Sequence, residues 1–133
     1  MQIRIYYEDT DCGGVVYHSN YLKYMERSRT ELLRDGGIDL AQYHDKGIVF
    51  AITEANLKYR AAAKYDDLLT IETQLTEVTS YRLEFTSSIY NQHGILCCKG
   101  VVKMVAVYTE KGSVARIPED ALHQIEEIFA QNR

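Results

Sequence analysis

The chain has 133 residues, of which 46% are hydrophobic, and this is enough for one domain, residues 1–133, with a core of ordinary size. The net charge of −4 and the dispersed basic residues give no general attraction for nucleic acid, so nucleic-acid binding is not expected. The N-terminus alternates polar and apolar residues and has no apolar run long enough for a signal peptide or a membrane span. A cytoplasmic protein is therefore predicted.

The cysteines are too few and too oddly placed to form a covalent framework. Cys12, Cys97 and Cys98 are odd in number, and two of them are neighbours. If Cys97 and Cys98 lie in a strand, their side chains are expected to point to opposite faces. The sequence therefore predicts neither a disulfide framework nor a zinc site.

A strand, a loop and a long helix are predicted for the first quarter of the chain. Residues Gln2 to Glu8 alternate as a half-buried strand, and a loop containing Gly13-Gly14 ends it. Helical spacing begins at Ser19 or Asn20, either of which can serve as the N-cap, and continues to Arg34. The predicted buried stripe of this helix contains Tyr21, Met25, Ser28 and Leu32, widened by Leu22 and Leu33.

The rest of the chain is predicted to contain four strands between two shorter helices. The predicted elements are a helix around Leu40 to His44, strands at Ile48 to Arg60, Leu69 to Thr76, Tyr81 to Ile89 and Ile95 to Tyr108, and a last helix with Pro118 in its first turn. The strands after residue 60 alternate in the way that is typical of antiparallel strands with one buried face. The predicted fold class is α+β, with about five mainly antiparallel strands and one long helix lying across them.

The loop before the long helix contains three acids in four positions, Glu8, Asp9 and Asp11. The last two are predicted to lie beside the helix N-terminus, where backbone N–H groups lack partners. A carboxylate there could act on an electrophile whose oxygen accepts those N–H groups. A helix cap or a turn explains a single loop aspartate without any catalytic role. The residues alone leave both interpretations open.

Three other residues of the loop allow further hypotheses. Gly13-Gly14 would let a ligand approach the backbone closely, although an ordinary turn explains the pair equally well. His18 could be a general base, an orienting donor or the partner of a reactive Cys12 thiol. A structural histidine near the helix cap is the simpler alternative, and Cys12 as the nucleophile is a lesser hypothesis.

Two charged groups lie outside the loop. Glu26, in the middle of the helix, could reach a pocket, but an ion pair with Lys23 or Arg29 is the favoured interpretation. A basic group at the end of the second strand is able to receive phosphates or to form a solvated strand edge. Its members are Lys58, Arg60 and Lys64.

A family resemblance takes the interpretation further. The run Tyr7-Glu8-Asp9-Thr10-Asp11, then Gly14-Val15-Val16-Tyr17-His18, Asn20-Tyr21 and Met25-Glu26-Arg27, resembles the hotdog-fold acyl-CoA thioesterases of the 4-hydroxybenzoyl-CoA thioesterase type. It is similar in particular to the bacterial YbgC-like branch found with the Tol-Pal system. The resemblance covers nearly the whole chain, since Asp66-Asp67 and the later strand order also fit. It implies a hotdog fold, in which a five-stranded sheet wraps around one long central helix.

The resemblance implies that the chain hydrolyses acyl-CoA to a free acid and coenzyme A. It makes Asp11 the catalytic carboxylate, either as the nucleophile or as the base that activates water. It places the backbone N–H of His18 against the thioester carbonyl, with the imidazole as a second contributor, and Tyr7 beside the site. It assigns the coenzyme A phosphates to Lys58, Arg60 and Lys64. No metal and no bound cofactor are implied, because coenzyme A is part of the substrate.

The sequence departs from the family pattern at two positions. Cys12 stands where alanine or serine is usual, and Ala62 stands where a proline is common before the Asp-Asp pair. The first departure could alter reactivity beside Asp11. The second could loosen the loop near the basic group.

The family also implies assembly into dimers or tetramers with active sites at subunit interfaces. A thin sheet with one covering helix agrees with this, because it leaves apolar surface to bury. The expected partners are the acyl-CoA substrate, further copies of the chain and an acyl-carrier protein. Two alternatives are another hotdog reaction, hydration or dehydration of an acyl thioester by a His–acid pair, and a non-catalytic acyl-CoA or acyl-carrier-protein binding scaffold.

Overall fold

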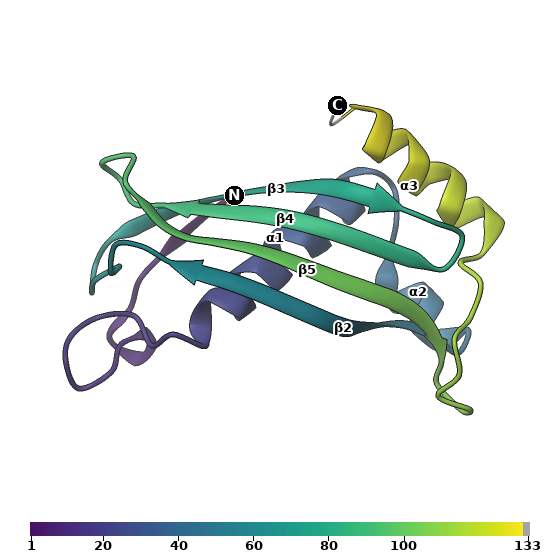
Figure 1. Cartoon of the computed structure of the whole chain (residues 1–133), viewed down its shortest axis with the longest axis horizontal. Coiled ribbons are helices and arrows are strands. Elements are labelled where there is room, and N and C mark those ends of the chain that lie inside the picture. The colour runs from purple at the N-terminus through teal and green to yellow at the C-terminus, as the bar shows by residue number, and fades with distance from the viewer. Residues whose placement is uncertain (132–133) are drawn as a thin grey trace.

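The computed structural model describes residues 1–131 as one curved sheet with α1 lying across one of its faces (Figure 1). The elements in chain order are β1 (Gln2–Arg4), the 3-10 helix η1 (Tyr7–Asp9), α1 (Asn20–Asp35), α2 (Leu40–Asp45), β2 (Ile48–Tyr59), β3 (Leu68–Val78), β4 (Arg82–Tyr90), β5 (Leu96–Tyr108) and α3 (Glu119–Gln131). The five strands are ordered β1-β3-β4-β5-β2, and every neighbouring pair is antiparallel. The predicted α+β class is confirmed.

The period-two patterns predicted for the last two strands place their apolar side chains under α1. Along β4 every second side chain is buried, from Leu83 to Ile89, and the same holds for β5 from Cys98 to Ala106. The helix approaches β5 closely at Gly100, where an added Cβ would lie 2.8 Å from the Sδ atom of Met25. Because Gly100 has no side chain, the fully buried Met25 can occupy that space.

The apolar core has two parts, one under each half of α1. The part near the N-terminal half of α1 includes Ile5, Tyr24, Met25 and Ile89. The part near the C-terminal half contains residues of α2, α3 and the sheet, among them Leu33, Tyr43, Phe85 and Ile125. The last helix therefore completes the second part of the core, where its residue Ile125 is fully buried.

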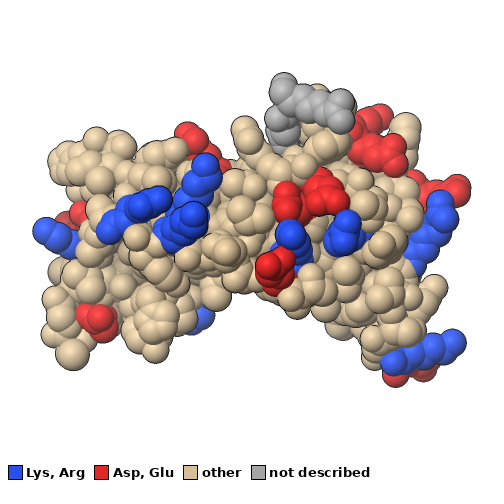
Figure 2. All heavy atoms as spheres, viewed as in Figure 1, with Lys and Arg blue, Asp and Glu red and all other residues tan. Residues whose placement is uncertain are grey.

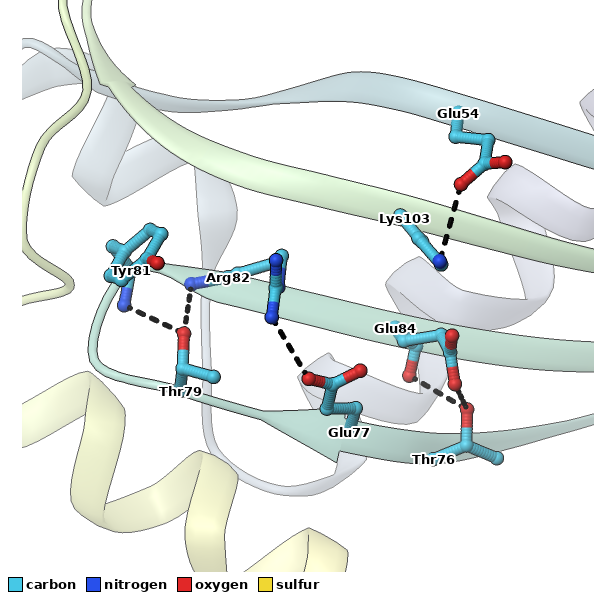
Figure 3. Close-up of polar contacts among 8 residues, drawn as sticks. All are labelled: Glu54, Thr76, Glu77, Thr79, Tyr81, Arg82, Glu84 and Lys103. Atoms are coloured by element: carbon cyan, nitrogen blue, oxygen red, sulfur yellow. Dashed lines mark hydrogen bonds and ion pairs between the residues drawn. The ribbon is translucent and has the colours of Figure 1, made fainter.

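The other face of the sheet is polar and exposed. Lys103 of β5 pairs with Glu54 of β2 at 3.2 Å, and Arg82 of β4 pairs with Glu77 of β3 at 3.0 Å (Figure 3). Figure 2, which looks onto this face, shows acidic and basic side chains interleaved over the middle of the sheet. Exposed ion pairs of this kind contribute about 0–1 kcal/mol each, so they keep the face solvated more than they stabilise the fold.

The predicted first strand, Gln2 to Glu8, is wrong after Arg4. The backbone N–H of Tyr6 donates to the Asp9 carboxylate at 2.8 Å, and the N–H of Asp9 donates to the Tyr6 carbonyl at 3.0 Å. These two hydrogen bonds close a 3-10 turn where the alternating pattern predicted extended chain. Tyr7, which lies in this turn, is 79% exposed.

The predicted N-cap position of the long helix is confirmed at Ser19, one of the two candidates. Ser19 occupies the N-cap position of α1, but its side chain makes no capping hydrogen bond. Asn20, the other candidate, is the first helical residue, and its amide donates to a carbonyl outside the helix. At the other end of the chain, Pro118 directly precedes α3, and its carbonyl accepts the Leu122 N–H at 2.8 Å.

The prediction that Cys97 and Cys98 point to opposite faces is wrong, because both side chains are buried. Ile89 of β4 pairs with Cys98, whereas Tyr90 pairs with Leu96, so Cys97 is an extra residue in a β-bulge. The bulge interrupts the alternation and turns both thiols inward. Cys12, Cys97 and Cys98 are all free.

Within residues 1–131, no helix is both long and apolar enough to cross a membrane.

Candidate active site

A tight loop between η1 and α1 carries the acids and glycines that the sequence analysis singled out. The Asp11 N–H donates to the Val15 carbonyl at 2.9 Å, and the Gly14 N–H donates to the Asp11 carbonyl at 3.1 Å. Gly14 has a φ of +81°, a left-handed conformation that glycine adopts without steric cost. The loop therefore folds back on itself and presents residues 11–14 to solvent.

The Asp11 carboxylate is exposed and is held by one hydrogen bond. Its Oδ1 atom accepts the Gly13 N–H at 2.8 Å, and Oδ2 has no hydrogen bond among the described residues. A Cβ on Gly13 would lie 3.2 Å from Oδ1, which is a tight contact, so glycine keeps this arrangement relaxed. One oxygen is thus oriented by the backbone while the other is free to react.

Asp9 has a structural role at the base of the same loop. Its backbone carbonyl accepts both the Tyr17 N–H, at 3.0 Å, and the Asn20 side-chain amide, at 2.8 Å. Its carboxylate accepts the Tyr6 N–H. Asn20 is only 9% exposed. Asp9 therefore ties both ends of the loop to the first residue of α1, which matches the turn-ordering alternative for this aspartate.

His18 lies at the junction between the loop and α1. Neither its backbone N–H nor that of Ser19 donates a hydrogen bond within the described part of the chain. The exposed imidazole packs against the Tyr17 ring, with centroids 4.4 Å apart, and contacts the Tyr59 ring edge to face. No described carboxylate contacts the ring, so the His–acid pair of the hydratase alternative is not present within these residues. Two backbone donors are thus available directly before α1, on the segment that also carries Asp11.

Three tyrosines, Tyr21, Tyr24 and Tyr59, lie around the junction between the loop and α1. The Tyr59 hydroxyl, from the end of β2, donates to the His18 carbonyl at 3.2 Å, and Tyr21 accepts the Ala63 N–H at 3.3 Å. The buried Tyr24 hydroxyl has no hydrogen-bond partner among the described residues. Burial, followed by the charge of the nearby Asp9 carboxylate, raises the pKa of Tyr24 above its ordinary value. Burial also raises the pKa values of Tyr21 and Tyr59, so all three hydroxyls stay protonated near neutral pH.

Asp11, Cys12 and His18 lie on the same segment between η1 and α1, whereas Tyr7 lies in η1 and contacts another residue. The Tyr7 ring stacks edge to face on Tyr65, with centroids 6.1 Å apart, and makes no described contact with Asp11 or His18. Cys12 is exposed, and no contact joins its sulfur to the His18 imidazole within residues 1–131. The thiol–imidazole hypothesis therefore has no structural support.

The predicted basic group is divided between two places. Lys58 and Arg60 line a shallow groove on the outer face of the sheet together with Lys99, the register partner of Lys58. Figure 2 shows basic side chains gathered over this end of β2 and β5. Lys64 instead bridges to Val15 in the loop that carries Asp11. The outer face also differs from the face on which Tyr59 reaches His18, since neighbouring residues of a strand point to opposite sides.

Asn20, Tyr59 and Tyr24 belong to the site but were missed by the sequence reasoning as site residues. A polar residue at the start of a helix, such as Asn20, indicates a side-chain hydrogen bond near the helix end. Its partner, the Asp9 carbonyl, lies 11 residues upstream, so the local sequence does not identify it. Tyr59 lies 41 residues from His18 and no local pattern connects them. Tyr24 was placed outside the predicted buried stripe, although it is 1% exposed.

Among residues 1–131, no three His, Cys, Asp or Glu side chains are grouped so that they could hold a metal ion. The arrangement instead offers an oriented carboxylate, unpaired backbone donors at a helix start and protonated tyrosines. These groups are suited to acting on a carbonyl carbon.

Comparison with known proteins relates this arrangement to a family. Residues 6–125 match the Thioesterase-like superfamily. The chain is 34% identical over 125 residues to the acyl-CoA thioester hydrolase YbgC of Escherichia coli O6:H1, covering 94% of this chain and 93% of that protein. It is 36% identical over 121 residues to the acyl-CoA thioesterase YbgC of Haemophilus influenzae, covering 89% of this chain and 87% of that protein.

A solved structure shares the fold at lower sequence identity. The DHNA-CoA thioesterase of Staphylococcus aureus superposes with a TM-score of 0.90 at 21% identity, covering 100% of this chain and 93% of that one. The hotdog fold predicted from the resemblance is confirmed by this likeness. The superfamily match and the two YbgC relatives together show that the chain belongs to the thioesterase-like superfamily.

Proposed function

We propose that Asp11 supplies the catalytic carboxylate of this chain, which is an acyl-CoA thioesterase. The observation that carries the proposal is the geometry of its side chain. One carboxylate oxygen accepts the Gly13 N–H at 2.8 Å, and the other has no described partner. The loop that carries it is tied to the start of α1 through Asp9 and Asn20. A carboxylate so placed is preorganised to meet a carbonyl that binds at the helix N-terminus.

The unpaired N–H groups of His18 and Ser19 are the proposed donors to the thioester carbonyl oxygen. They would strengthen their hydrogen bonds as that oxygen gains negative charge in the tetrahedral transition state. Loss of one such donor typically costs about 2.7–4 kcal/mol, and the dipole of α1 adds roughly 0.3–1 kcal/mol. The His18 imidazole and Tyr7 are proposed as further contributors beside the substrate.

Asp11 can complete the reaction in two ways. As a nucleophile it forms a mixed anhydride with the acyl group, coenzyme A leaves as a thiolate that takes up a proton, and water then cleaves the anhydride to release the acid. As a general base it removes a proton from water, which attacks the carbonyl directly, and the thiolate leaves. Both routes need the same free carboxylate oxygen, and both yield a free acid and coenzyme A.

The remaining parts of the proposal concern binding and assembly. The proposed contacts for the phosphates of coenzyme A are Lys58, Arg60 and Lys64. Lys99 is added to them because it lines the same groove as Lys58 and Arg60. Since β2 is an edge strand, a ligand could pass around it between the outer face and the loop. We also propose a homotetramer built from dimers, acyl-carrier protein as a partner that supplies acyl groups, and a cytoplasmic location.

The test is the hydrolysis of a panel of acyl-CoAs by Asp11→Asn. We expect kcat to fall by a factor on the order of 10²–10⁴, with an unchanged unfolding transition, because the amide retains the shape of the side chain but neither attacks nor accepts a proton. Glu8→Gln is the matched control, since Glu8 is an exposed neighbouring acid that makes no described side-chain hydrogen bond. Wild-type rates in Asp11→Asn would rule out the assignment.

A further inference from the structure

The loop that carries Asp11 is attached at its far end to the connector between β2 and β3, residues 61–67. The Val16 N–H donates to a carbonyl of this connector at 2.8 Å, and Val15 forms an antiparallel bridge with Lys64. The Val15 carbonyl in turn accepts the Asp11 N–H at 2.9 Å. The position of the Asp11 backbone therefore depends on where the connector holds these two valines.

The same connector also holds the chain just before the loop. The Ile5 N–H donates to the Asp67 carbonyl at 2.9 Å, and the Ile5 carbonyl accepts the Asp66 N–H at 2.9 Å. Asp66 has a φ of +70°, which is uncommon for a residue other than glycine, so the turn keeps its shape only through its surroundings. Both ends of the loop thus meet at the connector, and the turn from Lys64 to Asp67 sets the distance between them.

The Asp67 carboxylate closes this turn and is itself held from outside it. Its Oδ2 atom accepts the Lys64 N–H at 2.9 Å, and its Oδ1 atom accepts the side-chain amide of Gln92 at 3.0 Å. The Gln92 amide oxygen accepts the Leu68 N–H at 3.1 Å, which fixes the orientation of the amide. Gln92 lies in the hairpin between β4 and β5, at the same end of the sheet as the connector and the loop (Figure 1).

We propose that Asp67 is a positioning residue for the hydrolysis of the thioester. Its carboxylate fixes the turn that spaces the two ends of the loop, and Gln92 fixes the carboxylate. Asp67 acts through Lys64 and the valines bonded to the connector, and a misplacement of a reacting group by about 1 Å can lower a rate by about 10²-fold. This inference rests on the proposed reaction at Asp11.

A reciprocal exchange of two side chains tests the proposal. An amide has one acceptor oxygen where a carboxylate has two, so Asp67→Asn loses the hydrogen bond from Lys64 or the one from Gln92, whichever way it is turned. Gln92→Glu alone places two carboxylates against each other. Together the two substitutions restore every hydrogen bond, because the new amide donates to the new carboxylate, which still accepts the Leu68 N–H.

We expect kcat to fall about tenfold in Asp67→Asn and about threefold in Gln92→Glu, and to return to within about twofold of the wild-type value in the double variant. The rates are measured at saturating acyl-CoA, so that any displacement of Lys64 from the coenzyme A phosphates affects KM and not kcat. Asp66→Asn is the matched control, because this exposed side chain makes no described hydrogen bond and asparagine tolerates a positive φ.

The outcomes separate the inference from the function on which it rests. Wild-type kcat in Asp67→Asn, with or without a lower urea midpoint, would make Asp67 a purely structural residue and overturn the inference while the reaction at Asp11 stands. The inference is also overturned if the double variant does not recover, or if Asp67→Asn lowers the residual rate of Asp11→Asn by the same factor as in the wild type. Wild-type rates in Asp11→Asn would instead remove the reaction site itself.

A second variant decides the question if Asp67→Asn does not fold. Gln92→Ala removes the same hydrogen bond from the exposed hairpin and leaves the turn itself unaltered. A kcat about threefold lower, with an unchanged unfolding midpoint, supports the inference, and a wild-type kcat overturns it.

Discussion

The junction between the loop and α1 differs in kind from the contact between α1 and the sheet a few residues later. At the junction, exposed side chains and backbone groups are placed by a few hydrogen bonds, with the Asp9 carbonyl accepting two of them. Near Met25, the helix is fixed by close apolar packing against Gly100 and its neighbours. The junction positions reactive groups and buries little apolar surface. The contact near Met25 buries more apolar surface and contains no reactive group.

This difference implies that catalysis and stability can be changed separately. Burial of apolar side chains dominates the free energy of folding, whereas a net hydrogen bond contributes about 0.5–1.5 kcal/mol. A displacement of a catalytic group by about 1 Å can lower a rate by a large factor. Substitutions in the packed region should therefore affect unfolding, and substitutions at the junction should affect turnover.

The largest expected effect on stability comes from Gly100→Ala. The new methyl group would lie 2.8 Å from the Met25 Sδ atom and 3.2 Å from the Leu57 Cγ atom, so the helix or the strand must shift. We expect the free energy of unfolding to fall by about 1–3 kcal/mol, as is typical of an overpacked core. Urea denaturation measures this loss of free energy, and Glu72→Ala is the control because Glu72 is exposed on β3. An unchanged midpoint would show that the helix does not depend on this close approach.

A smaller loss of stability, but a clear loss of activity, is expected for Asn20→Ala. The substitution removes the 2.8 Å hydrogen bond to the Asp9 carbonyl, which still accepts the Tyr17 N–H. We expect about 1 kcal/mol of destabilisation and about a tenfold lower kcat, because the loop becomes less well positioned. Steady-state kinetics would measure this beside Gln74→Ala, an exposed amide on β3. A normal kcat would mean that the loop is held in another way.

The smallest effect on activity is expected from modification of Cys12. Burial raises the pKa of Cys98 to about 11 and also raises that of Cys97, so a thiol reagent at pH 8 should label only Cys12 until the protein unfolds. Turnover should survive this labelling, since no contact joins Cys12 to His18 within the described residues. Labelling of three thiols in the folded protein would contradict the buried placement.

The same shift predicts how stability depends on pH. The folded state holds the Cys98 proton more tightly than the unfolded state, whose thiol has a pKa near 9. The stabilising contribution is therefore complete below pH 9 and is lost as the pH rises toward 11, by at most about 1.4 kcal/mol per pH unit. Replacement by the non-ionising Cys98→Ala should make this dependence smaller in urea denaturation curves measured at pH 9 and 10.5, and the remainder belongs to the other buried groups with raised pKa values, such as Cys97.

Much of the fold could be predicted because its patterns are local. The alternation in β4 and in most of β5 and the helical spacing of α1 are each visible within a short window of sequence. The exceptions are places where one hydrogen bond or one extra residue overrides the pattern. The Asp9 carboxylate closes a turn in the expected first strand, and the bulge at Cys97 reverses the direction of one thiol.

The site was less predictable than the fold because it is built from distant residues. Family resemblance selected Asp11 and His18, which the structure places in one loop. Periodicity could not reveal that Tyr59 reaches His18 or that Lys58 and Lys64 lie in different places, since these depend on how β2 meets the loop. The ion pair predicted for Glu26 from its spacing is wrong, because its carboxylate accepts the Thr30 hydroxyl at 3.2 Å. It pairs with neither Lys23 nor Arg29 within the described residues.

If the junction between the loop and α1 serves to position Asp11, a double-mutant cycle on kcat shows it most directly. Asn20→Ala is expected to lower kcat about tenfold when Asp11 is present and to have little effect on the residual rate of Asp11→Asn, because there is then no carboxylate to position. Equal, additive losses in both backgrounds would contradict the account, since they would show that Asn20 and Asp11 act independently.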